Sequence, residues 1–421
     1  MKSEKINHEP PILLVIAVAL AVALAVGAVF SRFGGFGTGK CADKTSFQTY
    51  AKAINEIEIP ESAEIIALGE ATHGNAEFQK LKLDIFKVMA EKYGIRAFCL
   101  EADYGCCEAA NRYIHGGEGT AQEAAAATGF AIYRTQEMAE LLSWMRTWNE
   151  TAKEGDDLRF YGFDMQRIEY NYEYLLEAAE QAGLDTTELK AIWDEEAREY
   201  VKDLDREKKR RVLETIQDQL AKLDEKGAEF AKILLENDSV FDLDAGSGAK
   251  TRDQMMSENV LWILDQEASY GCSRIFLSAH NGHVEQNGSY GPQSKVMGNL
   301  LADVVGEDRY YAIGTDFYKA KVNLPRRDRS RMTHTFYSYD SMAKAAKECG
   351  YDQCWLDFAS IPQDSPLYGS AYKYGWMGSV GEGYSVVMNV FPMTYRVWRC
   401  PAECYDSMIF VADAHPTTIS D

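Results

Sequence analysis

Five short apolar runs, each ending in polar or charged residues, constrain the fold of this chain more than any other feature. The first run, residues 65–69, ends at Glu70, and His73 follows three positions later. The other runs start near residues 95, 158, 274 and 310 and end at Glu101, Asp164, His280 and Asp316. Segments of helical length separate them, as parallel strands require. The pattern predicts an α/β fold with a mainly parallel sheet flanked by helices.

The first run leads into a strand-to-helix corner. Residues 75–93 carry apolar side chains at helical spacing, which predicts a helix there. Gly69 and Gly74 would let the backbone turn tightly between the strand and this helix. Open α/β sheets place their ligand crevice at the carboxyl ends of the strands. We therefore expect Glu70 and His73 to meet the polar ends of three other runs, at Glu101, Asp164 and His280 with His283, at one edge of the sheet.

The connection from Asp164 to Arg274 is too long for one crossover helix. Its charged, alanine- and leucine-rich stretch predicts an inserted helical lobe or cap over about 168–250, wholly helical between 170 and 237. Residues 194–211 read as a solvated helix face. Residues 251–254, Thr-Arg-Asp-Gln, have the form of a capping box that opens the next helix. In the tail, β-forming residues predict that 351–358 and 384–398 complete the sheet.

An uncharged apolar run at residues 11–30 is about long enough to span a bilayer as a helix. It exceeds the apolar core of about 7–15 residues in a typical cleavable signal peptide, so we predict an anchor or uncleaved signal. A short segment, 1–10, precedes it, and the glycine-rich residues 31–42 would form a tether to the folded domain, 43–421. We expect a single-pass protein of the cell membrane with this domain outside the cytoplasm.

Charge and cysteine usage exclude several classes of function. The net charge of −21 argues against nucleic acid as a partner, because its phosphates would be repelled. The nine cysteines form no repeated C-x-x-C pair, so the sequence contains no zinc-ribbon or redox framework. A Gly-x-Ser-x-Gly elbow is also missing, which leaves a serine-esterase mechanism without sequence support.

The polar motifs, taken in order, resemble the erythromycin esterase family. They are residues 69–74 (GEATHG), 100–103 (LEAD), 161–166 (YGFDMQ), 252–253 (RD) with 258–259 (EN), and 279–284 (AHNGHV). The resemblance implies an α/β hydrolytic domain with a helical lobe over a cleft, which opens macrolide lactones with water and without a covalent acyl-enzyme. It implies a catalytic set of Glu70, His73, Glu101, His280 and His283. Residues that bind substrate or support this set would be Lys82, Asp164, Arg252 and Arg134. Members of the family carry an arginine where Lys82 stands here.

Three functions fit these residues. The first is a hydrolase that cleaves a small-molecule ester or lactone with histidine-activated water and needs no cofactor or metal. The second is a metal-dependent hydrolase at the same cleft, because histidine and carboxylate side chains are ligands that zinc and manganese accept. The third is a binding or cell-envelope assembly protein that uses the cleft without turnover.

Overall fold

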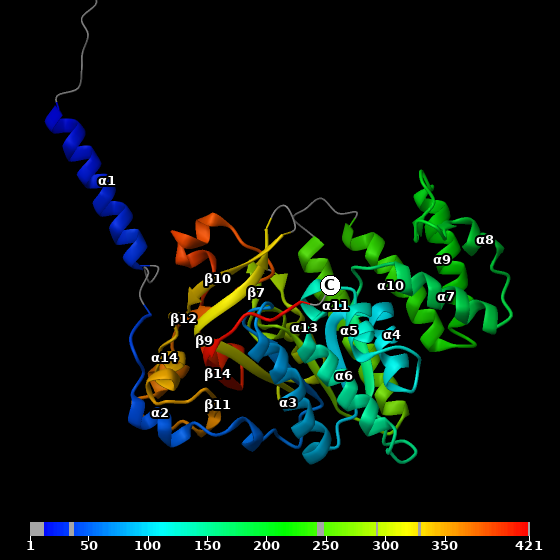
Figure 1. Ribbon diagram of the computed structural model, residues 1–421, viewed down its shortest axis with the longest axis horizontal. Coiled ribbons are helices and arrows are strands. Elements are labelled where there is room, and N and C mark those ends of the chain that lie inside the picture. Colours follow the sequence, from blue (N-terminus) through cyan, green and yellow to red (C-terminus); the bar gives the residue numbers. More distant parts are fainter. Residues whose placement is uncertain (1–11, 33–37, 242–247, 292–293, 327–329, 420–421) are drawn as a thin grey trace, which may run out of the picture.

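The computed structural model describes residues 12–32, 38–241, 248–291, 294–326 and 330–419. An eight-stranded sheet lies between two layers of helices (Figure 1). In spatial order its strands are β11 (Gln353–Asp357), β14 (Ser407–Ala414), β9 (Tyr310–Pro325), β1 (Ile65–Glu70), β6 (Ile275–His280), β2 (Ala97–Asp103) and β3 (Arg159–Asp164), and β10 (Arg331–Tyr337) pairs with the second half of β9. The β11–β14 and β9–β10 pairs are antiparallel and the other pairs are parallel. The predicted α/β fold with a mainly parallel sheet is confirmed.

Alternating side chains of β1 face two separate cores. Ile65 and Ala67 belong to one core, and Ile66 and Leu68 belong to the core on the opposite face. The helices over the first face are α11 (Gly248–Ser269), α13 (Met297–Val305) and α14 (Ser341–Glu348). The helices over the second face are α3 (Ala76–Tyr93), α4 (Tyr104–Ile114), α5 (Ala121–Ala127) and α6 (Gln136–Asn149). A strand buried on both faces reads as a continuous apolar run, which is why the sequence located β1.

A helical lobe follows β3 and lies at the right of Figure 1. It contains α7 (Glu169–Gln181), α8 (Thr187–Ala191), α9 (Arg206–Leu220) and α10 (Glu225–Phe241). The prediction of a wholly helical stretch is wrong, because β4 (Trp193–Asp194) and β5 (Glu199–Tyr200) form a small hairpin. The Trp193 ring stacks on Tyr172 of α7 with centroids 4.0 Å apart, so aromatic packing holds the hairpin against the lobe. The predicted solvated helix face of 194–211 is helical only from Arg206 onward.

Two further sequence predictions fail. Helix α11 begins at Gly248, so residues 251–254 lie inside the helix and do not open it as a capping box. In the tail, β11 joins the sheet as predicted, but 384–398 does not. That segment contains two 3₁₀ turns and the start of β13 (Arg396–Arg399), which pairs with β12 (Gly375–Gly378) in a separate hairpin. The strand that completes the sheet is the buried β14, which was not predicted.

The remaining elements are short or terminal. They are α2 (Lys44–Tyr50), α12 (Asn281–Val284), α15 (Tyr368–Ala371), α16 (Pro401–Cys404), β7 (Ser289–Gly291) and β8 (Ser294–Lys295), together with the N-terminal helix α1 (Ile12–Arg32). The side chains described in α1, residues 16–27, are exposed. In the part of the chain that the structure describes, no helix is both long enough and apolar enough to cross a membrane. Residues 1–11 and 33–37, and the side chains of 12–15 and 28–32, lie outside that part, so the anchor, the tether and the domain division stay predictions.

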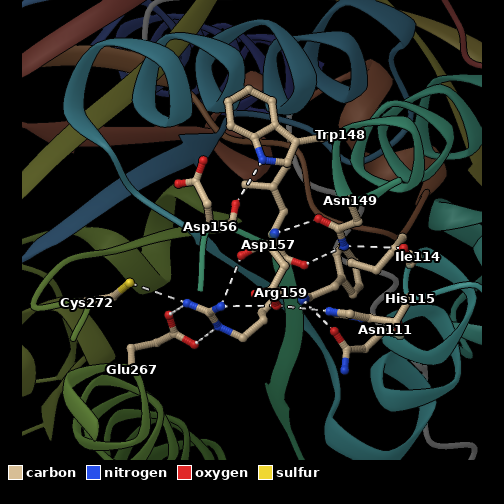
Figure 2. A network of polar contacts seen from close by, with 12 residues as sticks. Asn111, Ile114, His115, Trp148, Asn149, Asp156, Asp157, Arg159, Glu267 and Cys272 are labelled. Carbon is tan, nitrogen blue, oxygen red and sulfur yellow. Dashed lines mark hydrogen bonds and ion pairs between the residues drawn. The ribbon is translucent and has the colours of Figure 1, made fainter. Parts of the chain in front are cut away.

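Ion pairs join β3 to α11 at both ends of the strand. At its start, Arg159 donates two hydrogen bonds of 2.7 Å to the two carboxylate oxygens of Glu267, near the end of the helix (Figure 2). At its end, Asp164 accepts two hydrogen bonds from Arg252, near the start of the helix. Because removing one partner of a buried ion pair leaves an uncompensated charge, both pairs resist sliding of the helix along the strand. This arrangement fixes where Arg252 lies.

Two asparagine side chains hold the start of β3 from the other side (Figure 2). Asn149 of α6 accepts a hydrogen bond of 2.6 Å from the Leu158 N–H and donates one of 2.9 Å to its carbonyl. Asn111 of α4 accepts a hydrogen bond of 3.0 Å from the Phe160 N–H. Each amide therefore satisfies backbone groups that a neighbouring strand would otherwise bind.

Candidate active site

A cavity of about 300 Å³ opens at the carboxyl ends of β1, β2, β3 and β6. Six predicted site residues line it together, namely His73, Glu101, Asp164, Arg252, His280 and His283. Five lining residues were not predicted, namely Phe130, Ile132, Gln166, Gly381 and Glu382. The sheet therefore brings the polar ends of four separate apolar runs to one place, as the sequence led us to expect.

Close packing explains the glycines of the first corner. A Cβ atom on Gly69 would lie 2.2 Å from the side-chain oxygen of Asn281, and one on Gly74 would lie 2.4 Å from the carbonyl oxygen of Asn323. Neither glycine has a positive φ, so the expected tight turn does not explain why glycine stands at these two positions. Asn281 uses its amide to bind both backbone groups of Thr315, at 2.7 and 3.2 Å, just beyond the point where β1 and β9 separate. Gly69 leaves the space for this amide.

Glu70 and Lys82 orient His73 from behind the cavity. The Glu70 carboxylate binds His73 Nδ1 through Oε1 at 2.5 Å and Lys82 Nζ through Oε2. Lys82 is 1% exposed; it also donates to the side chain of Gln79 at 3.1 Å and lies over the Tyr133 ring. Because Nδ1 donates to Glu70, the lone pair of the neutral His73 ring resides on Nε2. The predicted residue Lys82 thus acts on His73 through Glu70.

The charges around this pair shift both pKa values. Burial favours the neutral form of Glu70, but Lys82 and His73 outweigh it and lower the pKa of the carboxyl. Burial also favours neutral His73, but the hydrogen bond and charge of Glu70 outweigh it and raise the pKa of the imidazole. Glu70 therefore makes His73 a stronger base than a free histidine.

Arg252 connects the carboxylates of two strands. Its guanidinium binds Asp164 at 3.1 and 2.7 Å and Glu101 at 2.9 Å. The other oxygen of Glu101 accepts a hydrogen bond of 2.7 Å from the backbone N–H of His280. Burial alone would raise the pKa of Glu101, but the charges of His283 and Arg252 lower it well below its usual range. Glu101 is consequently anionic at neutral pH, and its carboxylate holds the His280 backbone N–H.

His283 has partners at both ring nitrogens. Nδ1 lies 2.8 Å from Asp253 Oδ1, while Nε2 lies 3.2 Å from a guanidinium nitrogen of Arg252 and 3.3 Å from Glu101. Burial would lower the pKa of His283, but Glu101 and Asp253 together raise it. Because both nitrogens are engaged, this histidine is better placed to hold the charge network than to bind a water molecule.

His280 differs from both of these histidines. Its Nδ1 accepts a hydrogen bond of 3.2 Å from the Gly282 N–H, so the proton of the neutral ring is on Nε2. Nε2 is buried and has no hydrogen-bond partner in the described part of the chain. Burial, and then the neighbouring charges of His73 and His283, lower the pKa of His280 to about 3. The neutral ring therefore keeps an N–H with no partner among the described residues, and its centroid lies 5.0 Å from that of the His73 ring.

A family model described as erythromycin esterase matches residues 90–414 of the chain. The chain belongs to the erythromycin esterase family. The match includes Glu101, Asp164, Arg252, His280 and His283, and it begins after the Glu70 corner. The family predicted from the sequence is thereby confirmed, and family membership supports a hydrolase.

Individual members of the erythromycin esterase family and proteins of similar fold agree with this assignment. Erythromycin esterase type II from Escherichia coli is 24% identical over 359 residues, which are 71% of this chain and 82% of that protein. The crystal structure of a succinoglycan biosynthesis protein has a TM-score of 0.74 at 18% identity, covering 90% of this chain and 98% of the other. A mutant of the erythromycin esterase EreC in its open conformation has a TM-score of 0.56 at 16% identity, covering 86% and 93%. At these identities the two solved structures show a shared fold.

In this esterase-family chain, the carboxylates that a metal ion would need already pair with cations. Glu70 binds Lys82, and Glu101 binds Arg252. Among the described residues, no group of three or more histidine, cysteine, aspartate or glutamate side chains is arranged to hold a metal ion. The donor set at this cavity therefore does not fit the metal site of the second function considered from the sequence.

Arg134 lies apart from the other predicted site residues. It follows the 3₁₀ turn Ala131–Tyr133 and lines a neighbouring cavity. It therefore does not line this cavity, and its predicted role in substrate binding stays a prediction. Of the lining residues that were missed, Gln166 lies inside a motif that the sequence offered, directly after the third strand. Gly381 and Glu382 come from the C-terminal segment and had no sequence signal.

Proposed function

We propose that this chain is a hydrolase that cleaves a carboxylic ester or lactone with water activated by His73. One observation carries the proposal: His73 and His280 have opposite hydrogen-bonding states at the same cavity. The first offers a lone pair on Nε2, and the second offers an N–H on Nε2. Ester hydrolysis needs a base for the water and a donor for the oxyanion.

The two histidines would divide the proton transfers as follows. His73 Nε2 takes a proton from water while the water oxygen bonds to the carbonyl carbon, and the carbonyl π electrons move to oxygen. The His280 N–H donates a hydrogen bond to that oxyanion. The C–O bond to the leaving group then breaks, and the leaving alkoxide takes the proton from His73. The anionic Glu70 stabilises the imidazolium formed between the two steps.

The lining of the cavity supports direct attack by water. No serine, threonine or cysteine is among the described residues that line it, so a side-chain nucleophile is not at hand there. A volume of about 300 Å³ is at the lower end of the range for small-molecule sites. The ester group and a few flanking atoms fit in this space, and the rest of a larger substrate such as a macrolide would extend out of it.

Turnover by the purified full-length chain in mild detergent tests the proposal. A panel of neutral esters, simple lactones and macrolides is incubated with the protein, and acid release is measured with added methanol as a competing nucleophile. We expect hydrolysis of at least one panel member and no acylated protein by intact mass. An acyl-enzyme would contradict the direct water mechanism, and no hydrolysis of any compound would contradict the hydrolase.

The pH profile tests the role of Glu70. His73 must be neutral to act as a base, and its pKa is raised. Activity should therefore increase with pH, and the midpoint of this increase should lie above the ordinary histidine pKa of about 6.5. In Glu70→Gln the anion that stabilises the imidazolium is lost, so the pKa of His73 falls and the midpoint of the increase in activity moves to lower pH. The plateau rate should fall as well. An unchanged midpoint in this variant would show that Glu70 does not raise the pKa of His73.

For location, we propose that residues 11–30 hold the chain in the cell membrane as a single span, with the esterase domain outside the cytoplasm. The support is the length of this uncharged apolar run and its N-terminal position. Protease added to intact cells should degrade the domain while a cytoplasmic marker protein stays intact. Protection of the domain until the cells are lysed would show the opposite orientation or an internal location.

A further inference from the structure

A second cavity of about 450 Å³ contains three arginine side chains, Arg134, Arg167 and Arg198. They come from different parts of the fold: the segment after α5, the loop after β3, and the β4–β5 hairpin of the helical lobe. Two carboxylates, Glu123 and Glu169, also line the cavity. Three guanidinium groups and two carboxylates therefore line this cavity, and Glu173 pairs with Arg198 beside it.

This arginine cavity shares a wall with the catalytic cavity. Phe130 lines the catalytic cavity, and the Arg167 guanidinium lies over its ring, 5.5 Å from the ring centre. The consecutive residues Gln166 and Arg167 line the catalytic and the arginine cavity, respectively. One aromatic ring and one chain segment thus separate the two spaces. A substrate whose ester group lies beside His73 would extend past Phe130 to reach the arginines.

The arginines have donors left for a ligand. In the described part of the chain, the Arg134 side chain makes no hydrogen bond and no ion pair. Arg167 donates one hydrogen bond, of 3.1 Å, to the carbonyl of Gly129. Arg198 pairs with Glu173 in the lobe. The guanidinium groups of Arg134 and Arg167 therefore retain most of their N–H donors.

The two carboxylates in the cavity are directed at backbone donors. Glu123 accepts hydrogen bonds from the N–H and the hydroxyl of Thr120, at 2.7 and 2.9 Å, in the capping box of α5. Glu169 accepts one of 3.1 Å from the Ile168 N–H. The N-cap residue of α7, Ile168, makes no side-chain capping hydrogen bond within the described part of the chain, and the acidic Glu169 is the first residue of this helix.

We propose that the arginine cavity binds an anionic group, a carboxylate or phosphate, of the same substrate whose ester group is hydrolysed beside His73. The planar guanidinium fork of Arg134 matches the two oxygens of such a group. This inference rests on the proposed function and specifies its substrate class as an ester that carries a negative charge a few bonds from the carbonyl.

Two chromogenic esters of equal length test the proposal. The para-nitrophenyl monoester of glutaric acid ends in a carboxylate, and para-nitrophenyl pentanoate ends in a methyl group at the same position. Wild-type full-length protein should have a kcat/KM about 10- to 100-fold higher for the anionic ester, the effect of a charge-assisted hydrogen bond. Arg134→Gln should remove this preference by raising KM for the anionic ester only, and Arg134→Lys should keep part of it.

Arg210→Gln is the matched control, because Arg210 is exposed on α9 and pairs with Glu214 at 2.7 Å, away from both cavities. It should leave both rates unchanged. Equal kcat/KM values of the wild type for the two esters, or an equal loss on both in Arg134→Gln, would overturn the proposal.

Binding separates this inference from the proposed function. Glutarate is titrated into the wild type and Arg134→Gln by calorimetry, which needs no turnover. If neither ester is hydrolysed but glutarate binds at least about tenfold more weakly to the variant, the hydrolase fails and the anion site stands. Wild-type protein that does not bind glutarate, or a variant that binds it equally well, would overturn the anion site whatever the turnover. Circular dichroism of Arg134→Gln and Arg134→Lys checks that both variants fold.

Discussion

His73→Asn should lower kcat for ester hydrolysis by about 10²- to 10⁴-fold, the usual effect of losing a general base. Asparagine keeps a polar side chain next to Glu70 but has no lone pair that can take a proton from water at neutral pH. KM should change little, because the ester carbonyl binds to other groups. The variant should also keep its thermal stability within a few degrees, since His73 lies at the cavity and outside both apolar cores.

His415→Asn provides a matched control for this experiment. His415 binds Glu77 through Nδ1 at 2.6 Å, so it forms the same kind of histidine–glutamate pair as His73, but it lines a different cavity. Its replacement should leave kcat unchanged. If His73→Asn retained the wild-type rate on a substrate that the protein hydrolyses, His73 would not be the base.

His280→Ala should lower kcat by about 10²- to 10³-fold, the range observed when one oxyanion donor is removed. His280→Gln keeps an N–H donor on a side chain of similar length and should recover part of the rate. The pKa of His280, lowered to about 3, keeps the ring neutral throughout the pH range in which His73 titrates. Removing His280 should therefore reduce the rate at every pH without adding a further pH-dependent step to the profile.

The pair of His280 variants separates a donor from a structural role. If His280 is a hydrogen-bond donor, kcat should be highest in the wild type, lower in the glutamine variant and lowest in the alanine variant. A histidine that only fills space would give glutamine and alanine variants of equal rate with lower thermal stability. A His280→Ala enzyme at the wild-type rate would require another group to bind the oxyanion.

The sequence located β1, β2, β3, β6 and β9, because strands that are buried on both faces read as apolar runs whatever surrounds them. The buried strand β14 was nonetheless missed. The sequence also located Glu70, Glu101, Asp164 and His280, since polar residues directly after buried strands must meet at one edge of a parallel sheet. The β4–β5 hairpin was missed because its charged residues look like a helix surface, and the Tyr172–Trp193 stacking that stabilises it is a tertiary contact.

Pairings between distant residues could not be read from the sequence. Nothing in the chain order shows that Lys82 would lie behind Glu70, or that Arg252 would bridge two strands. The cavity wall at Glu382 comes from a C-terminal segment that contacts the first corner through a backbone hydrogen bond from the Val380 N–H to the Ala71 carbonyl. Contacts of this kind depend on the folded backbone and leave no local periodicity.

Asn111, which binds the start of β3, also affects how the protein behaves at high concentration. β3 is an edge strand of the sheet, and open edges recruit strands from other molecules. The Phe160 N–H points away from β2 and donates its hydrogen bond to the Asn111 side chain. A strand from a second copy would have to displace this amide and the helix that carries it. We therefore expect Asn111 to hinder pairing of this edge with a strand of a second copy, and its loss to increase aggregation at high protein concentration.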